Sequence, residues 1–309
     1  MTDQPLVPPS LVQVRDLTVS FVSRDATVNA VNGVSFDLAR GEVMTILGES
    51  GSGKSVTLKA MMRLLPAKKS RIGGAVTIDG HAMLSLDDAK LSDVRGTAVS
   101  MIFQEPMLAF DPVFTVGNQI AEAITRHEPV SQDAAMKRAL DLLELVQIPS
   151  AKRRLEAYPH ELSGGMRQRA MIALALACRP SLLLADEPTT ALDATVQIQI
   201  LLLLRQLQRD LGMAVIFVTH DVGVAVEIAD KVAVMYAGRF VETGPLAEVV
   251  GQRRHPYTAG LPSGPADRRR ADHRARRHDP GADPRPAARP PPRSRHGPDP
   301  DHPRSRRRR

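Results

Sequence analysis

The sequence predicts an α/β fold in which a mixed, mainly parallel sheet carries helices on both faces. Short apolar runs typical of buried strands alternate with segments of helical spacing along most of the chain. The run at residues 182–185 is apolar on both faces, as a central parallel strand requires. The run at residues 43–47 leads through a Gly-rich loop into a helical pattern, which predicts a strand–loop–helix unit.

An antiparallel β subdomain is predicted near the N-terminus. Residues 11–21 and 30–38 alternate apolar and polar residues, as half-buried strands do, and residues 23–26 form a turn between them. Residues 1–10 contain prolines and are expected to form a loose leader. Phe21 ends the first strand, where an ordinary core aromatic and a stacking surface for a base fit the residues equally well.

The Gly-rich loop reads Gly-Glu-Ser-Gly-Ser-Gly-Lys-Ser and matches the phosphate-binding pattern G-x-x-x-x-G-K-S/T. Its glycines allow successive backbone N–H groups to converge on an anion, and the following helix adds its positive N-terminal end. The lysine can reach the β- and γ-phosphates of a nucleotide, and the serine after it can ligate Mg²⁺. The predicted cofactor-binding residues of this unit are Gly48, Glu49, Ser50, Gly51, Ser52, Gly53, Lys54, Ser55 and Val56.

Polar side chains stand at the ends of three further apolar runs: Gln104, the pair Asp186 and Glu187, and His220. Because α/β sheets bind ligands at the carboxyl ends of their strands, we expect these residues to face the phosphates. Ser55, Gln104 and Asp186 are the predicted Mg²⁺ ligands, and Gln104 can also orient water. Glu187 is the predicted base that polarises attacking water, and His220 is the predicted contact to the γ-phosphate. Taken alone, each of these residues also fits an ordinary loop or helix-cap role.

A helical subdomain is predicted at about residues 105–178, because apolar residues fall at helical spacing within residues 115–157. Near its end, residues 162–169 read Leu-Ser-Gly-Gly-Met-Arg-Gln-Arg. A serine before two glycines at a helix start caps the helix and exposes N–H groups to an anion, although a plain capped helix also fits this short motif. This second predicted phosphate-type site has no lysine, so it would complement another site. Its residues are Ser163, Gly164, Gly165 and Met166.

Composition restricts the class of protein. No apolar run approaches the ~18 residues needed to span a bilayer, and no basic segment followed by an apolar core marks a secretory signal. The single cysteine, Cys178, excludes an internal disulfide, fits a reducing compartment, and is interpreted as a small core residue. The net charge of +7 belongs to the C-terminal part: residues 261–309 contain 15 Arg and 6 Asp, which leaves −2 on the rest.

Residues 259–309 are predicted to be an Arg/Pro-rich disordered tail, because they contain too few apolar residues to offset the entropy of ordering. Arg runs can bind nucleic acid or acidic lipid weakly, but no specific nucleic-acid partner is predicted. The composition is also that of a GC-rich gene translated in a shifted reading frame. We therefore hypothesise a frameshift near residues 259–264, which resequencing of the locus would decide.

The order of these motifs resembles the ABC-type ATPase family, whose signature is the Leu-Ser-Gly-Gly element. The resemblance covers about residues 11–258. More narrowly, the chain is similar to the dipeptide, oligopeptide and nickel importer branch. The segments that carry this similarity are Met-Ile-Phe-Gln-Glu-Pro-Met at residues 101–107, Tyr-Pro-His-Glu before the signature at 158–161, Glu-Pro-Thr-Thr-Ala-Leu-Asp at 187–193 and His-Pro-Tyr-Thr at 255–258.

The resemblance implies that two ATPase subunits, identical or homologous, face each other head to tail. ATP and Mg²⁺ on the phosphate loop of one subunit would meet the Leu-Ser-Gly-Gly segment of the other. Asp193 would cross the dimer interface, and Phe21 would stack on adenine. Gln104 and the helical subdomain would contact integral membrane permease subunits, which an extracytoplasmic solute-binding protein supplies with cargo. The ATPase would then be peripheral, at the cytoplasmic face of the inner or plasma membrane.

The predicted function is ATP hydrolysis that powers the import of peptides of the dipeptide or oligopeptide class. The same motifs fit nickel or another small solute, because the permease and the solute-binding protein choose the cargo. A soluble ABC ATPase of DNA repair or translation is disfavoured, because the chain has one cassette, no cysteine pairs and no sustained heptads.

Overall fold

The computed structural model describes residues 10–24, 26–189 and 192–261. Residues 1–9 of the predicted leader and residues 262–309 of the predicted tail lie outside the described residues. The strands are β1 (Val12–Val22), β2 (Thr27–Leu38), β3 (Val43–Leu47), β4 (Ser70–Ile78), β5 (His81–Ala82), β6 (Val99–Ile102), β7 (Leu182–Asp186), β8 (Ala214–Thr219), β9 (Lys231–Tyr236) and β10 (Arg239–Pro245).

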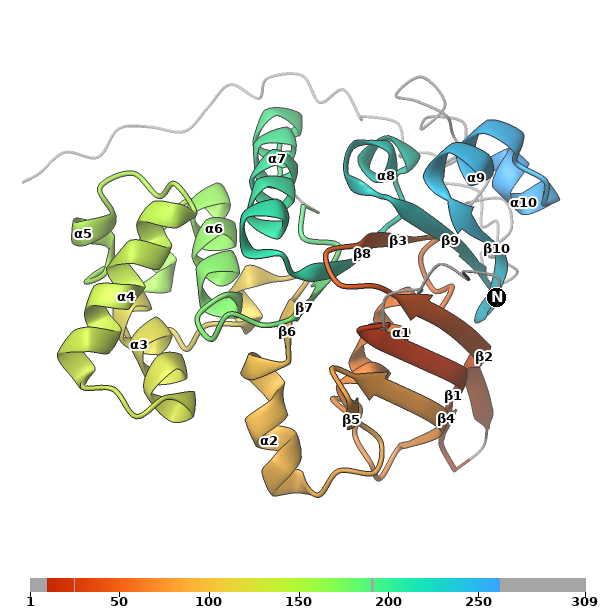
Figure 1. The fold of residues 1–309 in the computed structure, drawn as a ribbon, viewed down its shortest axis with the longest axis horizontal. Helices are drawn as coiled ribbons and strands as arrows, with labels where there is room; N and C mark the ends of the chain where they lie inside the picture. The colour runs from red at the N-terminus through yellow and green to blue at the C-terminus, as the bar shows by residue number, and fades with distance from the viewer. Residues whose placement is uncertain (1–9, 25, 190–191, 262–309) are drawn as a thin grey trace, which may run out of the picture. The chain divides into compact units, whose positions relative to one another are not determined.

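Helices connect these strands (Figure 1). They are α1 (Lys54–Met61), α2 (Asp88–Thr97), α3 (Val116–His127), α4 (Gln132–Leu145), α5 (Ala151–Arg154), α6 (Gly164–Ala175), α7 (Ala194–Leu211), α8 (Val222–Ile228), α9 (Leu246–Gln252) and α10 (Pro256–Gly260). Two short 3₁₀ turns, η1 (Pro106–Leu108) and η2 (Pro159–Glu161), accompany them. None of the described helices combines the length and the apolar character that crossing a lipid bilayer demands.

Two sheets form the framework. The larger has the order β10-β9-β3-β8-β7-β6, and the smaller has the order β2-β1-β4-β5. Strands β9, β3, β8, β7 and β6 run parallel to one another, and β10 forms an antiparallel hairpin with β9. The pairings in the smaller sheet are antiparallel. The predicted mixed, mainly parallel sheet and the predicted N-terminal antiparallel sheet are therefore confirmed.

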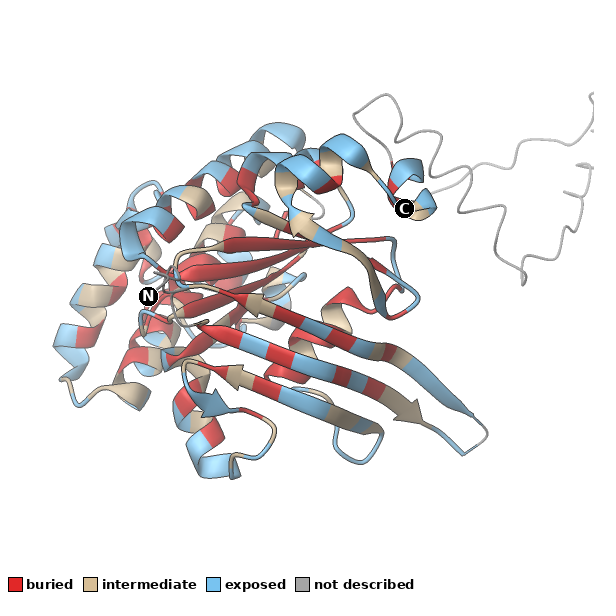
Figure 2. Cartoon of the chain, turned by 45° about the vertical axis from the view of Figure 1, so that its right-hand side comes forward, coloured by how far each residue is buried: buried red, intermediate tan, exposed pale blue. Residues whose placement is uncertain are grey.

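The central strands bury both of their faces, as Figure 2 shows by their continuous red. Leu183 and Phe217 point into a core cluster shared with α6 and α7. Leu184 and Ile216, their neighbours along the strands, point into a second cluster shared with α1 and the antiparallel sheet. Strands β1, β2 and β4 instead alternate buried and exposed residues, because only one of their faces packs against the core.

Capping residues mark the starts of two helices in the insertion. Thr115 caps α3 by accepting a hydrogen bond from Asn118 N, and Ser131 caps α4 by accepting one from Ala134 N. Helices α3 and α4 pack together and bury apolar stripes against the first cluster, so the predicted helical insertion is confirmed. Cys178 packs partly buried against the same cluster, in keeping with the interpretation as a core residue.

The sequence did not predict α2. This helix begins at a good cap, since the Asp87 carboxylate accepts a hydrogen bond from Lys90 N. It buries only Leu91 and Val94, and its regular geometry breaks near the end at Gly96, which has φ 99°. A helix with so few buried residues leaves little periodicity in the sequence.

Removing the Phe217 ring tests the predicted role of the two-sided core. Phe217 is 1% exposed, and we expect Phe217→Ala to lower the free energy of unfolding by about 3–5 kcal/mol. Phe114→Ala is the matched control, because that ring is 53% exposed and its loss should change stability by less than about 0.5 kcal/mol. Denaturant titration of both variants makes the measurement, and equal losses would contradict the assignment of the core.

Candidate nucleotide-binding and catalytic site

The phosphate loop lies between β3 and α1, as the sequence predicted. Gly53 caps α1 with φ 106°, and a Cβ atom there would approach Ala30 O to 2.5 Å. Only glycine fits such a backbone conformation against a neighbouring carbonyl. The β9–β10 hairpin supports the loop from the other side, because Gly238 N donates to Ser52 O at 2.9 Å. Ser52 Oγ is buried and has no hydrogen-bond partner among the described residues.

Lys54 is held inside this loop. Its side chain is 4% exposed, and its Nζ donates to Gly48 O and Glu49 O at 2.8 Å each. Burial lowers the pKa of Lys54, and the nearby carboxylates, with Glu187 first, oppose that shift. Nζ lies 4.0 Å from Glu187 Oε1. The fold thus brings the predicted phosphate-binding lysine beside the predicted catalytic base.

Ser55 and Asp186 form a second contact across the sheet edge. Ser55 Oγ donates to Asp186 Oδ1 at 2.6 Å, and Asp186 is 1% exposed. Burial raises the pKa of Asp186, and the hydrogen bond from Ser55 acts in the opposite direction. A hydroxyl and a carboxylate are the hard oxygen donors that Mg²⁺ prefers, and a buried carboxylate gains from a cation beside it. The donor set therefore fits Mg²⁺ bound with a nucleotide.

Glu187 follows Asp186 directly and contacts His220. Glu187 N donates to Val218 O at 3.1 Å, and its φ of 46° turns the chain out of the strand. Its carboxylate is 14% exposed, and Oε2 lies 3.6 Å from His220 Nδ1. Hydrogen bonding to Glu187 raises the pKa of His220, against the effect of burial. The two predicted catalytic residues are therefore adjacent.

Parallel register explains why these residues meet. Leu47 is paired with Thr219, and Asp186 is paired with Val218, so β3, β8 and β7 end at one edge. Strand β6 is the next neighbour of β7, with Ile102 opposite Ala185. Gln104 follows β6 at the same edge and is exposed. Its predicted roles toward Mg²⁺ and water remain predictions.

The segment Ser163–Met166 does not join the phosphate loop within one chain. It begins α6, where Ser163 Oγ accepts from Met166 N at 3.3 Å, and no hydrogen bond or ion pair between described residues links it to residues 48–55. Figure 1 shows α6 among the helices of the insertion, away from α1. Asp193 caps α7 in the same way, because its Oδ1 accepts from Val196 N at 3.0 Å. Thr190 and Ala191, just before it, lie outside the described residues.

Gly165 lies close to the start of α7. A Cβ atom at Gly165 would come within 3.0 Å of Val196 Cγ1, whereas one at Gly164 would have ordinary contacts. Phe21 lies at the end of β1, opposite Val28 of β2, and is partly buried against the second cluster. Strand β2 passes the phosphate loop at Ala30. Stacking of Phe21 on a base remains a prediction.

Sequence reasoning missed a side-chain contact to the phosphate loop. The hydroxyl of Tyr257 accepts a hydrogen bond from Glu49 N at 2.9 Å. The His-Pro-Tyr-Thr element had indicated a family branch, and no signal in the sequence connected it to a loop 208 positions earlier. Only the folded chain shows that α10 reaches the nucleotide site.

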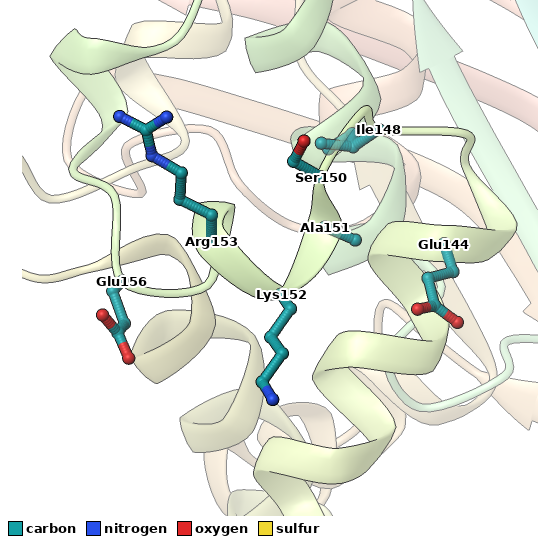
Figure 3. A pocket seen from close by; sticks show the side chains of 7 residues that line it. All are labelled: Glu144, Ile148, Ser150, Ala151, Lys152, Arg153 and Glu156. Atoms are coloured by element: carbon teal, nitrogen blue, oxygen red, sulfur yellow. The ribbon is translucent and has the colours of Figure 1, made fainter.

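A hollow on the described surface lies elsewhere, in the helical insertion. It has a volume of about 700 Å³ and is formed by the end of α4 and the turn around α5. Figure 3 shows its walls, from which Glu144, Lys152 and Glu156 extend. None of its lining residues belongs to the predicted nucleotide site. The predicted nucleotide site lies instead along the edge of the larger sheet.

A phosphate loop after a parallel strand, with a buried lysine, a Ser–Asp pair and a Glu–His pair at one sheet edge, defines a phosphate-loop nucleotide-binding protein of the α/β class. A comparison of the sequence with protein-family models matches residues 31–190 to the ABC transporter family. The chain belongs to this family, and the resemblance noted from its motifs is confirmed.

Curated relatives and solved structures support the same assignment. The chain is 50% identical to the oligopeptide transport ATP-binding protein OppD of Bacillus subtilis over 252 residues, or 81% of this chain and 70% of that protein. It is 49% identical to the dipeptide transport ATP-binding protein DppD of the same organism, over 81% of this chain and 75% of that protein. The dimeric ATP-binding cassette MJ0796, solved in a post-hydrolysis state bound to ADP and Pi, is 30% identical with a TM-score of 0.68. That match covers 76% of this chain and 98% of the other.

The Glu187–His220 contact predicts a raised titration midpoint for His220. The pKa of His220 is higher in the folded protein than the unfolded value of about 6.5. The contact therefore contributes its full stabilisation below about pH 6.5, and that stabilisation is lost as pH rises through the folded pKa. We expect NMR of the ring to give a midpoint above 6.5 that falls in Glu187→Gln. Glu227→Gln, which removes an exposed carboxylate of α8, should leave the midpoint unchanged. An unchanged His220 midpoint in Glu187→Gln would contradict the contact.

Proposed function

We propose that this protein is the ATP-hydrolysing subunit of an importer that moves peptides of the dipeptide or oligopeptide class across the cytoplasmic membrane. The observation that carries the proposal is the meeting of Lys54, Asp186 and Glu187 at one sheet edge, in a chain half identical to the ATP-binding proteins of peptide transport. Nickel or another small solute is the alternative cargo, because the cytoplasmic site does not contact the cargo.

The roles of the phosphate-loop residues follow from their positions. ATP with Mg²⁺ supplies a phosphoanhydride bond and the cation that neutralises its charge. Residues 48–56 cradle the phosphates through backbone N–H groups, and Lys54 adds its ammonium. Ser55 and Asp186 would hold the cation, with Gln104 as a third ligand. Two carbonyl groups of the same loop position the Lys54 ammonium, because Nζ donates to Gly48 O and Glu49 O.

Glu187 is the proposed general base. Its carboxylate is 14% exposed and lies 4.0 Å from the Lys54 ammonium. An ionised carboxylate can take the proton of an attacking water. His220, 3.6 Å from Glu187, orients this carboxylate and can contact the γ-phosphate. Gln104 orients the water from the neighbouring strand end.

A second ATPase subunit completes the site in this proposal. Ser163, Gly164, Gly165 and Met166 lie at the start of α6 and are not joined to the phosphate loop of their own chain. Their capped helix start suits the phosphates of a facing subunit. Asp193 lies at the interface, and Phe21 stacks on adenine. The dimeric state of the related solved cassette supports this arrangement.

An apolar hollow supports the proposed contact with membrane subunits. It has a volume of about 250 Å³ and opens between the end of β6 and the helices of the insertion, with Met62, Met101, Phe103 and Met171 in its walls. We propose that the permease subunits contact Gln104 and the helical subdomain on this side of the chain. The protein would then be peripheral at the cytoplasmic face of the membrane, with the solute-binding protein acting only through the permease.

The domain limits also remain proposals. We propose an ATPase domain of residues 11–258 with a helical subdomain of about residues 105–178, preceded by a leader and followed by the Arg/Pro-rich tail. The frameshift hypothesis bears on the tail alone. An intact single reading frame through residues 259–309 would refute it and would leave the proposed ATPase function unaffected.

Replacing the proposed base separates binding from hydrolysis. In Glu187→Gln we expect ATP to bind with unchanged affinity, turnover to fall by about 10²–10⁴-fold, and the closed dimer to accumulate with ATP. Lys54→Ala should instead weaken ATP binding, because the ammonium is lost from the pocket. Phosphate release, nucleotide titration and size-exclusion chromatography of both variants make the test. Normal turnover in Glu187→Gln would contradict the assignment of Glu187 as the general base.

Blocking the second phosphate-type site tests the dimer. Ser163→Arg places a bulky cation at the start of α6 and should prevent closure, so that hydrolysis falls while each subunit still binds ATP. Ser131→Arg is a matched control, because it also replaces a serine that caps a helix. Hydrolysis and ATP-dependent dimerisation are measured for both. If Ser163→Arg hydrolyses ATP at the rate of the control, the second site is unused.

A further inference from the structure

The last described segment of the chain crosses back to the nucleotide site. We call residues 255–261 the C-terminal strap. Its start is anchored on β10, because the Glu242 carboxylate accepts hydrogen bonds from Arg254 N at 3.0 Å and His255 N at 3.2 Å. Its end is anchored by Leu261, which is buried in a cluster with Leu47, the last residue of β3. Both ends of the strap are therefore tied to the body of the protein.

Tyr257 is the residue of the strap that reaches the phosphate loop. Its hydroxyl accepts a hydrogen bond from Glu49 N at 2.9 Å, and its ring packs on Tyr236 with the ring centres 4.7 Å apart. Burial raises the pKa of Tyr257 to about 12, so the hydroxyl stays protonated at physiological pH. The contact is thus a neutral hydrogen bond that pH does not switch in the working range.

The backbone of Glu49 is held through both of its peptide groups. Tyr257 holds the N–H of Glu49, and the Lys54 ammonium donates to the carbonyl of the same residue at 2.8 Å. Both contacts are made by backbone atoms of Glu49, and the Glu49 side chain is exposed. A chain of contacts therefore runs from the strap through the Glu49 backbone to the lysine that meets the phosphates.

We propose that Tyr257 is a positioning residue of the nucleotide site, which fixes the Glu49 backbone and through it the placement of Lys54. The C-terminal strap is then a working part of the phosphate loop rather than an end of the domain. This proposal rests on the proposed function, since it takes residues 48–55 as the site of ATP.

The physical effect follows from preorganisation. A loop whose N–H groups already converge binds an anion without first losing conformational freedom. The amide of Glu49 lies at the start of the loop, where no helix holds it, and Tyr257 supplies its acceptor from outside the loop. Without that acceptor the start of the loop moves more freely, and Lys54 loses a fixed partner. ATP binding then weakens, whereas residues of the hydrolytic step keep their positions.

Two matched variants test the proposal in the full chain. Tyr257→Phe removes the hydroxyl and retains the ring that packs on Tyr236. Tyr236→Phe removes a hydroxyl from the other ring of the pair, which makes no hydrogen bond among the described residues. A fluorescent ATP analogue gives the dissociation constant, deuterium exchange reports on the peptide that contains residues 48–55, and thermal melting reports on the fold.

We expect Tyr257→Phe to raise the dissociation constant by about two- to tenfold, the range of one neutral hydrogen bond, and to speed exchange in the phosphate-loop peptide. Its melting temperature and its turnover at saturating ATP should stay near wild type. Tyr236→Phe should match wild type in all four measurements. Glu242→Gln loosens the strap away from the loop and should shift affinity in the same direction by a smaller factor.

An unchanged dissociation constant in Tyr257→Phe would overturn the proposal, and so would an equal change in both tyrosine variants. Wild-type protein that fails to bind the ATP analogue would refute the proposed function instead. The two failures are therefore distinguishable in one set of measurements.

Discussion

The burial of opposite charges at one edge of the sheet is the constraint on which the site depends. Lys54 and Asp186 are 4% and 1% exposed, and taking such ions out of water costs several kcal/mol each unless other polar groups replace the water. Two loop carbonyls replace it for Lys54, and the Ser55 hydroxyl replaces it for Asp186. Glu187 adds a second carboxylate beside the ammonium. Two carboxylates beside one lysine would suit a divalent cation, and the loop amides would suit an anion, which is the combination that the proposed Mg²⁺ and ATP would supply.

The same constraint explains why the central strands must be apolar on both faces. The distances between the polar residues are set by the register of β3, β8 and β7, and burial of a strand face specifies register strongly, because a slip of one residue would turn buried side chains to the other face. Leu183 and Phe217 lock one face of these strands, and Leu184 and Ile216 lock the other. The core thus determines the geometry of the site, because it fixes the strands so that their last residues lie at the same edge of the sheet.

Much of this arrangement could be predicted from the sequence, because the signals are local. The phosphate loop, the strand that ends in Asp186 and Glu187, and the strand that ends before His220 each carry their pattern within about ten residues. Parallel strands then bring those ends together by topology. What the sequence could not give was any contact that depends on tertiary packing. The Tyr257–Glu49 contact joins residues 208 positions apart, and α2 owes its place to a cap and two buried side chains.

The separation of the two anion-type sites within one chain has an energetic consequence in the head-to-tail arrangement proposed above. The start of α1 and the start of α6 both present N–H groups and positive dipole ends, each worth only about 0.3–1 kcal/mol toward an exposed anion. Facing each other directly, two such helix starts repel. A triphosphate between them is attracted by both, and Lys54 adds a full charge on one side only. In the proposed dimer, the contact between subunits would therefore be stronger with ATP than after the γ-phosphate leaves. A site divided between two chains would thereby couple hydrolysis to separation of the subunits, which a complete site within one chain could not do.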